Sequence, residues 1–588
     1  MASINVGVDL GSTYTTVSIY DEDMKFVKAL SLDVDNPYIP SVVAREGKKF
    51  NFGKTAKFKT GKKKIKVFKA FKMLLNETDP VKLNERGYDA ISTNLSPEEE
   101  ENCNTPEQIT RRFLDYLLRK AMDYVNADSI KRVVIGIPEI WNEVTTYGGR
   151  TVLRDICCGF PFVEYKNEQE KTKDVQVISE PACASAFIAH KYLDQYDGKV
   201  LLIDYGGGTL DITLSSVTTD YAGAMEIKVL EKKGAGENVN KKVGKAGIIY
   251  METIVERAIQ KAFQDAEIDE SVEYDHEFYA AVNELEMEIV GDGKQRIEDC
   301  FEQYNLNLKK MKKAMEEIIE NGDEDEEDEW KFTTLEYHGE DIAISYAMLL
   351  EVYHDVIFPT LDKQLDLIMR YMDGAGIKYM DGTRKDFKVA VVGGFGKYYP
   401  VRKQVEKKFN FSANDLRRVD MPESDAEQAI SLGAALLAEG LVKLQRTSSF
   451  SFGILPKNGN KKEITYAIKY KQDIVPGEIY YTMDRDGSPY IFLLLGKIGE
   501  FVLNFGLDDS TASEVTLKNS VQRKLDNIKM NTYRTAKIGF SFDESEVITM
   551  HIVPCHPITK KNDDVKDTRY VLNRFDDLFD ISKYRPIK

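Results

Sequence analysis

The sequence predicts a two-lobed α/β protein followed by a small all-β domain. Three observations support this fold class. A strand–Asp–turn–strand pattern occurs twice, in residues 6–19 and 201–214. A buried-type strand ending in paired glycines, Lys388–Gly396, precedes an amphipathic helix around Val401–Phe409. From about Phe450 onward, apolar and polar residues alternate as in half-buried strands instead of recurring at helical spacing.

The repeated pattern is typical of a phosphate-binding hairpin. Its first copy reads Val6-Gly7-Val8-Asp9-Leu10-Gly11-Ser12-Thr13-Tyr14, and its second Leu201-Leu202-Ile203-Asp204-Tyr205-Gly206-Gly207-Gly208-Thr209. Glycine brings backbone N–H groups close to an anion, and hydroxyls add donors. An Asp at the strand end repels bare phosphate, so we infer that Mg²⁺ lies between them. Two copies predict two lobes that hold a nucleoside triphosphate; the alternative is two ordinary hairpins with glycine turns.

The strand at Lys388 predicts a contact with the nucleoside. It ends in Gly393 and Gly394, which have no side chain to keep a flat adenine or ribose away from the backbone. The N-terminus of the helix that follows favours negative charge.

These residues resemble the signature blocks of the seventy-kilodalton heat-shock (DnaK-type) chaperones. The matching blocks, in family order, are Asp9–Tyr14, Ala70–Leu75, Ile135–Asn142, Ser179–Ala184, Asp204–Asp211 and Val392–Gly394. The resemblance covers about the first 440 residues. It implies the fold of the actin, hexokinase and heat-shock ATPase superfamily: a two-lobed, actin-like ATPase domain with duplicated ribonuclease-H-like lobes, here followed by a β-sandwich.

Phosphoryl transfer to water requires held phosphates, neutralised charge and an oriented water, with little covalent work by the protein. The turns of both hairpins are expected to hold the phosphates through Gly11, Ser12, Thr13, Tyr14, Gly206, Gly207, Gly208 and Thr209.

The resemblance implies the remaining catalytic roles. It assigns Asp9 and Asp204 to the water shell of Mg²⁺, and Glu180 to the metal-bound and attacking waters. It assigns Lys72 to a positive charge near the γ-phosphate, and it makes Lys72, Glu180, Asp204 and Thr209 the catalytic set. Pro181 biases Glu180 away from helical φ/ψ, which predicts a side chain held at a strand end. The alternative for Lys72 is a solvent-facing lysine in a basic helix.

The nucleoside end departs from the family pattern. Gly393, Gly394 and Lys397 lie where the family contacts adenine and ribose, but Phe395 and Lys397 replace its usual Ser and Arg. Lys312 and Lys313 match the helix whose basic pair brackets the nucleoside, although an exposed charged helix explains them equally well. The family's acidic residue in the second lobe is absent from the apolar segment 246–250.

Further elements follow in chain order. Thr105 as N-cap and Pro106 open a helix, and later elements are expected at Arg132–Ile137 (strand), Ala182–Tyr192 (helix), 248–319 (helices) and Ala426–Leu444 (helix). The acidic run Asp323–Glu329 predicts an exposed loop tip. The C-terminal part begins with a strand at Ile464–Tyr470 and a turn at Asp486-Gly487, and ends in the hairpin Ile538–Ile552.

These elements predict the domain layout. Residues 1–446 form the nucleotide-binding domain, with lobe I at about 1–194 and 420–446 and lobe II at about 195–419. Residues 447–560 form a β-sandwich that resembles the family's peptide-binding domain, and 561–588 form a short tail. The family's helical lid is expected to be missing, since Phe575, Leu578 and Phe579 offer at most one short helix. The family's acidic linker is not matched by Leu441–Arg446.

Composition excludes several classes of protein. The 588 residues exceed what one core holds, so several domains are expected. A net charge of −17 disfavours binding to nucleic acid or anionic membranes. The first strand starts at once, which leaves no room for a signal peptide, and no apolar run reaches bilayer length. The six cysteines lack metal-ligand spacing, so reduced core cysteines and a cytoplasmic location are expected.

The sequence therefore predicts a chaperone-like ATPase that binds ATP or ADP with Mg²⁺, hydrolyses ATP slowly and binds unfolded polypeptide or a dedicated client through a lidless β-domain. Three alternatives stay open. One is an actin-like filament or partition ATPase, another is an ATP-sensing regulator with little turnover, and the third is a small-molecule kinase, for which no sugar-binding signature is found.

Overall fold

The computed structural model shows a mixed α/β protein whose described residues form six β-sheets. Two compact units share the chain. Unit 1 comprises Met1–Tyr192, Ser215–Leu230 and Gln428–Lys588, and unit 2 comprises Leu193–Leu214 and Glu231–Glu427. The structure describes residues 2–33, 36–60, 62, 64–90, 102–142, 148–165, 171–193, 197–219, 224–235, 247–268, 271–291, 293–321, 330–448, 451–455, 464–493, 501–504, 512–520, 523, 533–562, 568–571 and 585–586.

The first sheet of unit 1 has the strand order β3-β2-β1-β8-β9, and β4 pairs with β2. Strands β1 and β2 are antiparallel, whereas β1, β8 and β9 run parallel. Alternate residues Val6, Val8 and Leu10 of β1 are fully buried in the core. The strands are β1 Ser3–Leu10, β2 Tyr14–Asp21, β3 Phe26–Ala29, β4 Ile39–Pro40, β8 Ser129–Ile137 and β9 Val175–Ser179.

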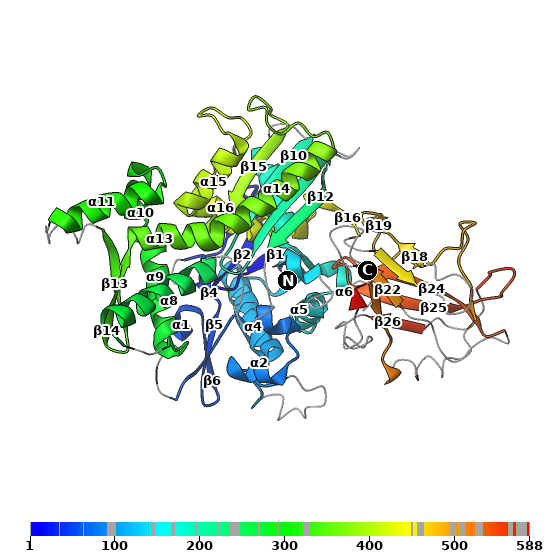
Figure 1. Cartoon of the computed structure of the whole chain (residues 1–588). Coiled ribbons are helices and arrows are strands. Elements are labelled where there is room, and N and C mark those ends of the chain that lie inside the picture. Colours follow the sequence, from blue (N-terminus) through cyan, green and yellow to red (C-terminus); the bar gives the residue numbers. More distant parts are fainter. Residues whose placement is uncertain are drawn as a thin grey trace. The chain divides into compact units, whose positions relative to one another are not determined.

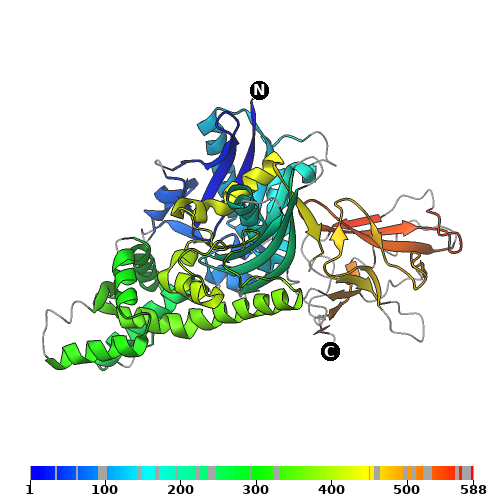
Figure 2. The same cartoon turned by 90° about the horizontal axis from the view of Figure 1, so that it is seen from above.

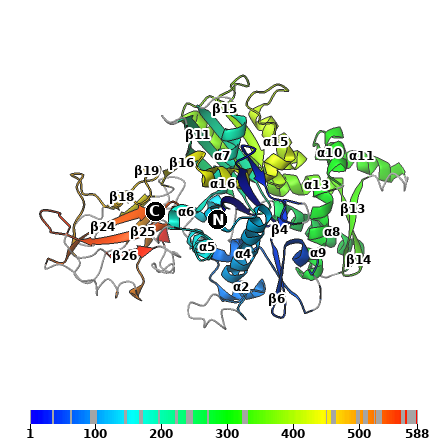
Figure 3. The same ribbon diagram turned by 180° about the vertical axis from the view of Figure 1, so that it is seen from behind.

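Helix α4 (Pro106–Val125) covers this sheet in unit 1. It begins as predicted, because the Thr105 side chain accepts a hydrogen bond from the Gln108 N–H and Pro106 occupies the first turn. Ile109, Phe113 and Leu117 line its buried face. It lies beside α5 in two opposite views (Figures 1 and 3). The other helices of this part are α1 Gly53–Lys57, η1 Met73–Asn76, α2 Pro80–Glu85, η2 Glu139–Asn142, α5 Gly148–Cys158, α6 Lys171–Asp174 and α7 Glu180–Tyr192.

A smaller antiparallel sheet of unit 1 has the order β6-β5-β7. Its strands are β5 Val42–Glu46, β6 Lys49–Phe52 and β7 Lys66–Lys69. Helix α16 (Glu423–Glu439) enters unit 1 at Gln428.

The second large sheet has the order β15-β10-β11-β12-β16-β19, and its strands β11 and β12 have residues in both units. Within unit 2, β10 and β15 pair in parallel. Within unit 1, β12 pairs in parallel with β16, which pairs with β19. The bounds are β10 Gly198–Tyr205, β11 Leu210–Thr219, β12 Met225–Ala235, β15 Phe387–Val392, β16 Val442–Thr447 and β19 Asp473–Ile474.

The rest of unit 2 is mainly helical. The hairpin of β13 (Lys331–Tyr337) and β14 (Glu340–Ser345) packs against α9 and α8 (Figure 1). The helices are α8 Gly247–Asp265, α9 His276–Val290, α10 Gly293–Gln303, α11 Leu308–Asn321, α13 Tyr346–Val352, the π-helix η3 Tyr353–Ile357, α14 Phe358–Gly374, η4 Phe395–Lys397 and α15 Tyr399–Phe409.

The C-terminal part of unit 1 is built from strands. One sheet has the order β18-β17-β22-β23-β27, and the other β20-β24-β25-β26 with β21 on β24. The long hairpin of β24 and β25 stands out in orange and red in Figure 2. The strands are β17 Ser451–Ile454, β18 Thr465–Ile468, β20 Tyr480–Tyr481, β21 Phe492–Leu493, β22 Phe501–Asn504, β23 Ala512–Val515, β24 Thr535–Phe542, β25 Ile548–Pro554, β26 Thr568–Val571 and β27 Arg585–Pro586.

Most expected elements are confirmed, and two boundaries are wrong. The helix expected over Ala426–Leu444 ends at Glu439, because Gly440 adopts a left-handed φ of 80° and Val442 starts β16. Glu180, expected outside a helix, is the first residue of α7, where a following proline loses no helical hydrogen bond. The expected loop tip at 323–329 and Phe575, Leu578 and Phe579 lie outside the described residues. Among the described helices, none is both long and apolar enough to cross a membrane.

Candidate phosphoryl-transfer site

The carboxyl ends of three parallel strands meet at one edge of the first sheet in unit 1. Asp9 at the end of β1 is in register with Gly136 of β8, and Gly136 is in register with Ile178 of β9. Glu180 follows two residues after Ile178. Strand pairing alone therefore brings Asp9 and Glu180, which are 171 positions apart in the sequence, to the same edge.

Lys72 reaches this edge from another part of unit 1. It follows β7 through Ala70, whose φ of 53° turns the chain. Its ammonium group bonds the Glu180 carboxylate and lies 3.5 Å from the Gly136 carbonyl oxygen. The residue is 2% exposed, and Glu180 is 8% exposed. The structure thus rules out the solvent-facing alternative for Lys72 and places it in a buried ion pair.

Asp9 lies beside this ion pair as a half-buried carboxyl group. Burial, together with the negative charge of Glu180, raises the pKa of Asp9 from 3.8 to about 7, although the Lys72 ammonium acts in the opposite direction. One lysine therefore does not offset two carboxylates here. A carboxylate short of positive charge at a strand end fits an additional cation with oxygen ligands, as Mg²⁺ prefers.

The turn after β1 has a shape that requires glycine. A Cβ atom at Gly11 would lie 2.1 Å from the Tyr14 carbonyl oxygen. The Ser41 hydroxyl donates to the Gly11 carbonyl at 2.7 Å, and the Ser41 N–H donates to the Thr13 carbonyl at 2.8 Å. Ser12 and Thr13 are partly exposed. Ser41 thus holds the turn in shape from a distant position, and the sequence motif did not reveal it.

Gly136 leaves room for the Glu180 side chain. A Cβ atom there would lie 2.7 Å from Ile430 of α16 and 3.1 Å from Cγ of Glu180. Helix α16 also approaches β1 closely, since a Cβ atom at Gly7 would lie 2.2 Å from the Ala435 nitrogen. The position of Glu180 is therefore set by backbone packing as well as by Lys72.

In unit 2, Asp204 is the next-to-last residue of strand β10 and is 5% exposed. Gly393 follows β15 with a φ of 83°, and a Cβ atom there would lie 2.6 Å from an Asp204 carboxylate oxygen. The register Asp204↔Val392 explains this contact. The two glycine-containing motifs of this unit are thus neighbours.

The turn Gly206–Thr209 is closed by a hydrogen bond from the Gly206 N–H to the Thr209 carbonyl, at 3.0 Å. The first residues of α8 pack onto it, because the Ile248 N–H donates to the Gly207 carbonyl at 2.8 Å. Gly206, Gly207 and Thr209 are partly exposed, whereas Gly208 is buried. The turn therefore presents backbone to the surface of unit 2.

The predicted nucleoside residues are only partly brought together. Gly394 is exposed, and a Cβ atom there would meet no atom within 4 Å. Lys397 instead bonds Glu427, and Lys312 bonds Glu351 at 2.6 Å. Lys313 lies 3.3 Å from Glu317 on the same helix. These three lysines have carboxylate partners within unit 2.

Phe395 has a structural role that the sequence did not indicate. It is 7% exposed, and its ring lies 5.2 Å from that of Tyr205 and 5.4 Å from that of Tyr398. Its side chain also contacts Gly247, where a Cβ atom would approach it within 3.3 Å. Phe395 therefore fixes the loop after Gly394 in an aromatic cluster.

The tip of the β24–β25 hairpin contacts the edge of the first sheet within unit 1. The Ser545 hydroxyl accepts a hydrogen bond from the Val177 N–H of β9 at 3.0 Å. Arg150 of α5 is 2% exposed and donates to the Ser545 carbonyl at 2.9 Å. Arg154 bonds Asp543, whose pKa is raised by burial although Arg154 acts in the opposite direction. The hairpin tip thus contacts β9 at Val177, three residues before Glu180 in the sequence.

Comparison with known proteins supports the resemblance. Residues 5–151 match the family model described as Hsp70 protein. Over this segment the chain is similar to the Hsp70 proteins. It is 25% identical over 245 residues to a heat shock cognate HSP70 protein of Trypanosoma brucei brucei, covering 38% of this chain and 32% of that protein.

One bacterial and one archaeal relative show a similar level of identity. The chain is 27% identical over 217 residues to the chaperone protein DnaK of Mycoplasmoides gallisepticum, covering 36% and 30% of the two chains. It is 24% identical over 225 residues to DnaK of Halobacterium salinarum, covering 36% and 29%. The match spans about a third of the length of these relatives. The family-model match includes Asp9 and Lys72 but ends before Glu180.

Proposed function

We propose that this Hsp70 relative is a chaperone-like ATPase that binds and slowly hydrolyses Mg²⁺-ATP. The observation that carries the proposal is the site in unit 1, where a carboxyl with a raised pKa lies beside a buried Lys–Glu pair at the ends of parallel strands. The proposed organisation is a two-lobed ATPase domain over 1–446 and a β-sandwich over 447–560.

The proposed roles follow from the chemistry of each group. Bound Mg²⁺ supplies positive charge that offsets the charge of the phosphates. Asp9 of unit 1 and Asp204 of unit 2 are the residues that would hold this ion through its water shell. The backbone N–H groups of the Gly11–Tyr14 and Gly206–Thr209 turns bind the phosphate oxygens.

Lys72 and Glu180 orient the attacking water in this proposal. The Lys72 ammonium donates to the water, and the Glu180 carboxylate accepts its proton or holds it by a hydrogen bond. Their mutual bond keeps both side chains in place before substrate arrives, so little reorganisation is required. These groups position and polarise the reactants and supply no covalent step, as is usual in phosphoryl transfer.

Gly394 offers the best-supported place for the nucleoside. Its backbone is exposed with open space around it, which suits the approach of a flat ring or ribose. The matched experiment compares Gly394→Leu with Gly374→Leu, a second exposed glycine with nothing within 4 Å. We expect Gly394→Leu to weaken ATP binding at least tenfold in calorimetry and Gly374→Leu to leave it unchanged. Equal ATP affinities of the two variants would contradict a nucleoside contact at Gly394.

The strands from residue 451 onward are proposed to bind extended polypeptide. Two antiparallel sheets offer edge strands whose main-chain groups can pair with an added strand. The Ser545 hydroxyl at the hairpin tip accepts a hydrogen bond from β9, the strand that leads to Glu180, which supports a link between the proposed polypeptide-binding strands and the proposed catalytic residue. A fluorescent unfolded peptide titrated against the full chain tests this. No change in anisotropy at high micromolar protein, for several unrelated hydrophobic peptides, contradicts it.

Turnover measurements test the catalytic proposal. Lys72→Ala and Glu180→Gln should each lower ATP hydrolysis by roughly 10²-fold, about 3 kcal/mol of barrier, with little change in ATP affinity. Asp204→Asn should weaken Mg²⁺-dependent turnover. Tight ATP binding without hydrolysis in the unmodified protein would instead identify an ATP-sensing regulator, and nucleotide-dependent sedimentation would identify a filament-forming ATPase.

A further inference from the structure

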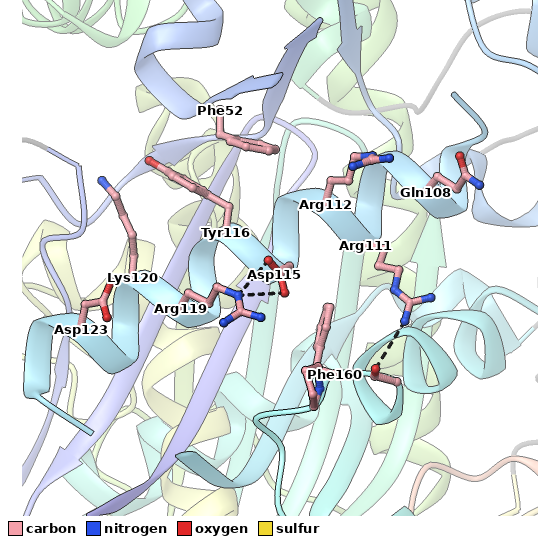
Figure 4. A pocket seen from close by; sticks show the side chains of 12 residues that line it. Phe52, Gln108, Arg111, Arg112, Asp115, Tyr116, Arg119, Lys120, Asp123 and Phe160 are labelled. Carbon is pink, nitrogen blue, oxygen red and sulfur yellow. Dashed lines mark hydrogen bonds and ion pairs between the residues drawn. The ribbon is translucent and has the colours of Figure 1, made fainter. Parts of the chain in front are cut away.

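A groove runs along the outer face of α4 in unit 1 and is separate from the candidate site (Figure 4). It has a volume of about 810 Å³. Its main wall is a stripe of α4 from Gln108 to Asp123, in which lining residues recur every third or fourth position. Phe52 of β6 and the segment Gly159–Pro161 after α5 form its other walls.

The groove is positively charged although the chain is strongly acidic. Four cationic side chains and two carboxylates line it, which leaves a net charge of +2 against −17 for the whole chain. The cations come as two pairs, Arg111 with Arg112 and Arg119 with Lys120. The pairs are eight residues apart, or about 12 Å along the helix axis.

Arg111 and Lys120 are held in place by carbonyl oxygens, which do not neutralise them. Arg111 donates to the Gly159 carbonyl at 3.4 Å, as Figure 4 shows, and Lys120 donates to the Leu32 carbonyl at 3.0 Å. Arg112 lies 4.4 Å from the centre of the Phe50 ring. Cations anchored on carbonyl oxygens keep their charge for a ligand, and their side chains lose less freedom when it binds.

In the cation pair of Arg119 and Lys120, the charge of Arg119 is partly neutralised by Asp115. An aromatic surface lies between the two cation pairs. Arg119 bonds both carboxylate oxygens of Asp115 at 3.0 and 3.1 Å (Figure 4). Tyr116 is stacked on Phe52, with ring centres 4.6 Å apart and an angle of 17° between the planes. The flat surface of this aromatic pair suits an apolar or aromatic side chain.

We propose that this groove binds an extended acidic segment of a partner protein, with two carboxylate side chains four residues apart and an aromatic side chain midway between them. A strand advances about 3.3 Å per residue, so four residues span about 13 Å and match the spacing of the cation pairs. Residues two apart point to the same side, which directs the middle side chain at Tyr116 and Phe52.

The shape and charge of the groove favour this ligand over other anions. The α4 stripe spans 15 residue steps, about 22 Å, which is longer than a compact small molecule requires. Asp115 and Asp123 would face the continuous row of phosphates of a nucleic acid, whereas a peptide places its charges only at the cation pairs. This surface goes beyond the proposed ATPase and is distinct from the strands proposed to bind unfolded polypeptide.

The test uses the full chain and a fluorescein-labelled peptide, Gly-Ser-Glu-Ser-Tyr-Ser-Glu-Ser-Gly, followed by anisotropy at low salt. A second peptide has Gln in place of both Glu residues. The main variant is Arg111→Glu with Lys120→Glu, and Arg111→Gln with Lys120→Gln is the milder form. Lys82→Glu with Lys131→Glu is the matched control, because both lysines are exposed in unit 1 and the net charge changes equally.

We expect the Glu peptide to bind at least tenfold more tightly than the Gln peptide. Charge reversal at Arg111 and Lys120 should weaken binding at least tenfold, the Gln variant less, and the control variant less than twofold. ATP turnover should be unchanged in all of them, so failure here is distinguishable from failure of the ATPase proposal. Equal binding by the reversed and control variants overturns the proposal, as does an oligonucleotide of equal charge that binds more tightly than the peptide.

Discussion

The ionised Asp9 side chain should lower the stability of the folded protein at neutral pH, because burial and the nearby Glu180 carboxylate disfavour its negative charge more than Lys72 favours it. The pKa of Asp9 is raised from 3.8 to about 7 by burial and by Glu180. A raised pKa means that the folded state binds the proton more tightly than the unfolded state. The stabilisation from the protonated form is therefore complete below pH 4 and is lost as the pH rises through 7.

The magnitude follows from the size of this change. A rise of about three pH units corresponds to about 4 kcal/mol at 1.36 kcal/mol per unit. Because Asp9 is only half-buried by surface exposure, solvent screens part of this energy, and we expect about 2 kcal/mol. The substitution Asp9→Asn removes the charge and keeps the shape, so it should stabilise the protein by this amount at pH 8. At pH 5 it should stabilise it by only about a third of that amount, because the unfolded carboxyl is already ionised while the folded one is not.

The assay is urea unfolding of both proteins from pH 5 to pH 8, with chelator present and without nucleotide. Asp23→Asn is the control, because Asp23 is an exposed carboxylate in the turn after β2. The difference between the unmodified protein and Asp9→Asn should grow with pH, whereas the control difference should stay flat. A difference for Asp9→Asn that does not change with pH would refute the reasoning.

Three further substitutions test the packing around the site. Gly136→Ala should cost about 1–3 kcal/mol in the free energy of unfolding, and should lower turnover because the new Cβ atom displaces Glu180. Lys72→Met should lower the free energy of unfolding by about 3–5 kcal/mol, because it leaves Glu180 buried without its partner. Adding Glu180→Gln should restore most of that loss. A double variant that is less stable than Lys72→Met would contradict the ion pair. Arg150→Ala should cost about 3 kcal/mol, because it leaves Glu546 without the guanidinium 3.1 Å away, and thermal unfolding that matches the unmodified protein would show that the hairpin does not depend on this contact.

The strands and their turns could be predicted from the sequence because the signals are local. Asp9 and Asp204 follow apolar runs, Gly393 directly follows the strand predicted at Lys388, and the turn at Asp486-Gly487 is present with a φ of 77° at the glycine. The Ala426 helix was predicted too long, because apolar residues continue past Gly440 into β16 and period alone does not mark the change.

The contacts that hold the site could not be predicted, because they join distant parts of the chain. Ser41 supports the Gly11 turn from 30 residues away, and Ser545 reaches Val177 across 368 residues. Phe395 looked like a departure from a nucleoside-binding pattern, but its burial in an aromatic cluster depends on Tyr205 and Tyr398. Only the folded chain brings such residues together. The assigned roles of the site residues and the domain bounds stay predictions.

The most direct test of the central claim is ATP turnover by the full chain with Mg²⁺, measured for the unmodified protein and for Lys72→Ala, each with and without an unfolded polypeptide. The account predicts slow hydrolysis that polypeptide changes in the unmodified protein, and a roughly 10²-fold lower rate in Lys72→Ala with ATP affinity retained. Equal turnover in the two proteins would contradict it, because the buried pair of Lys72 and Glu180 would then have no part in the reaction.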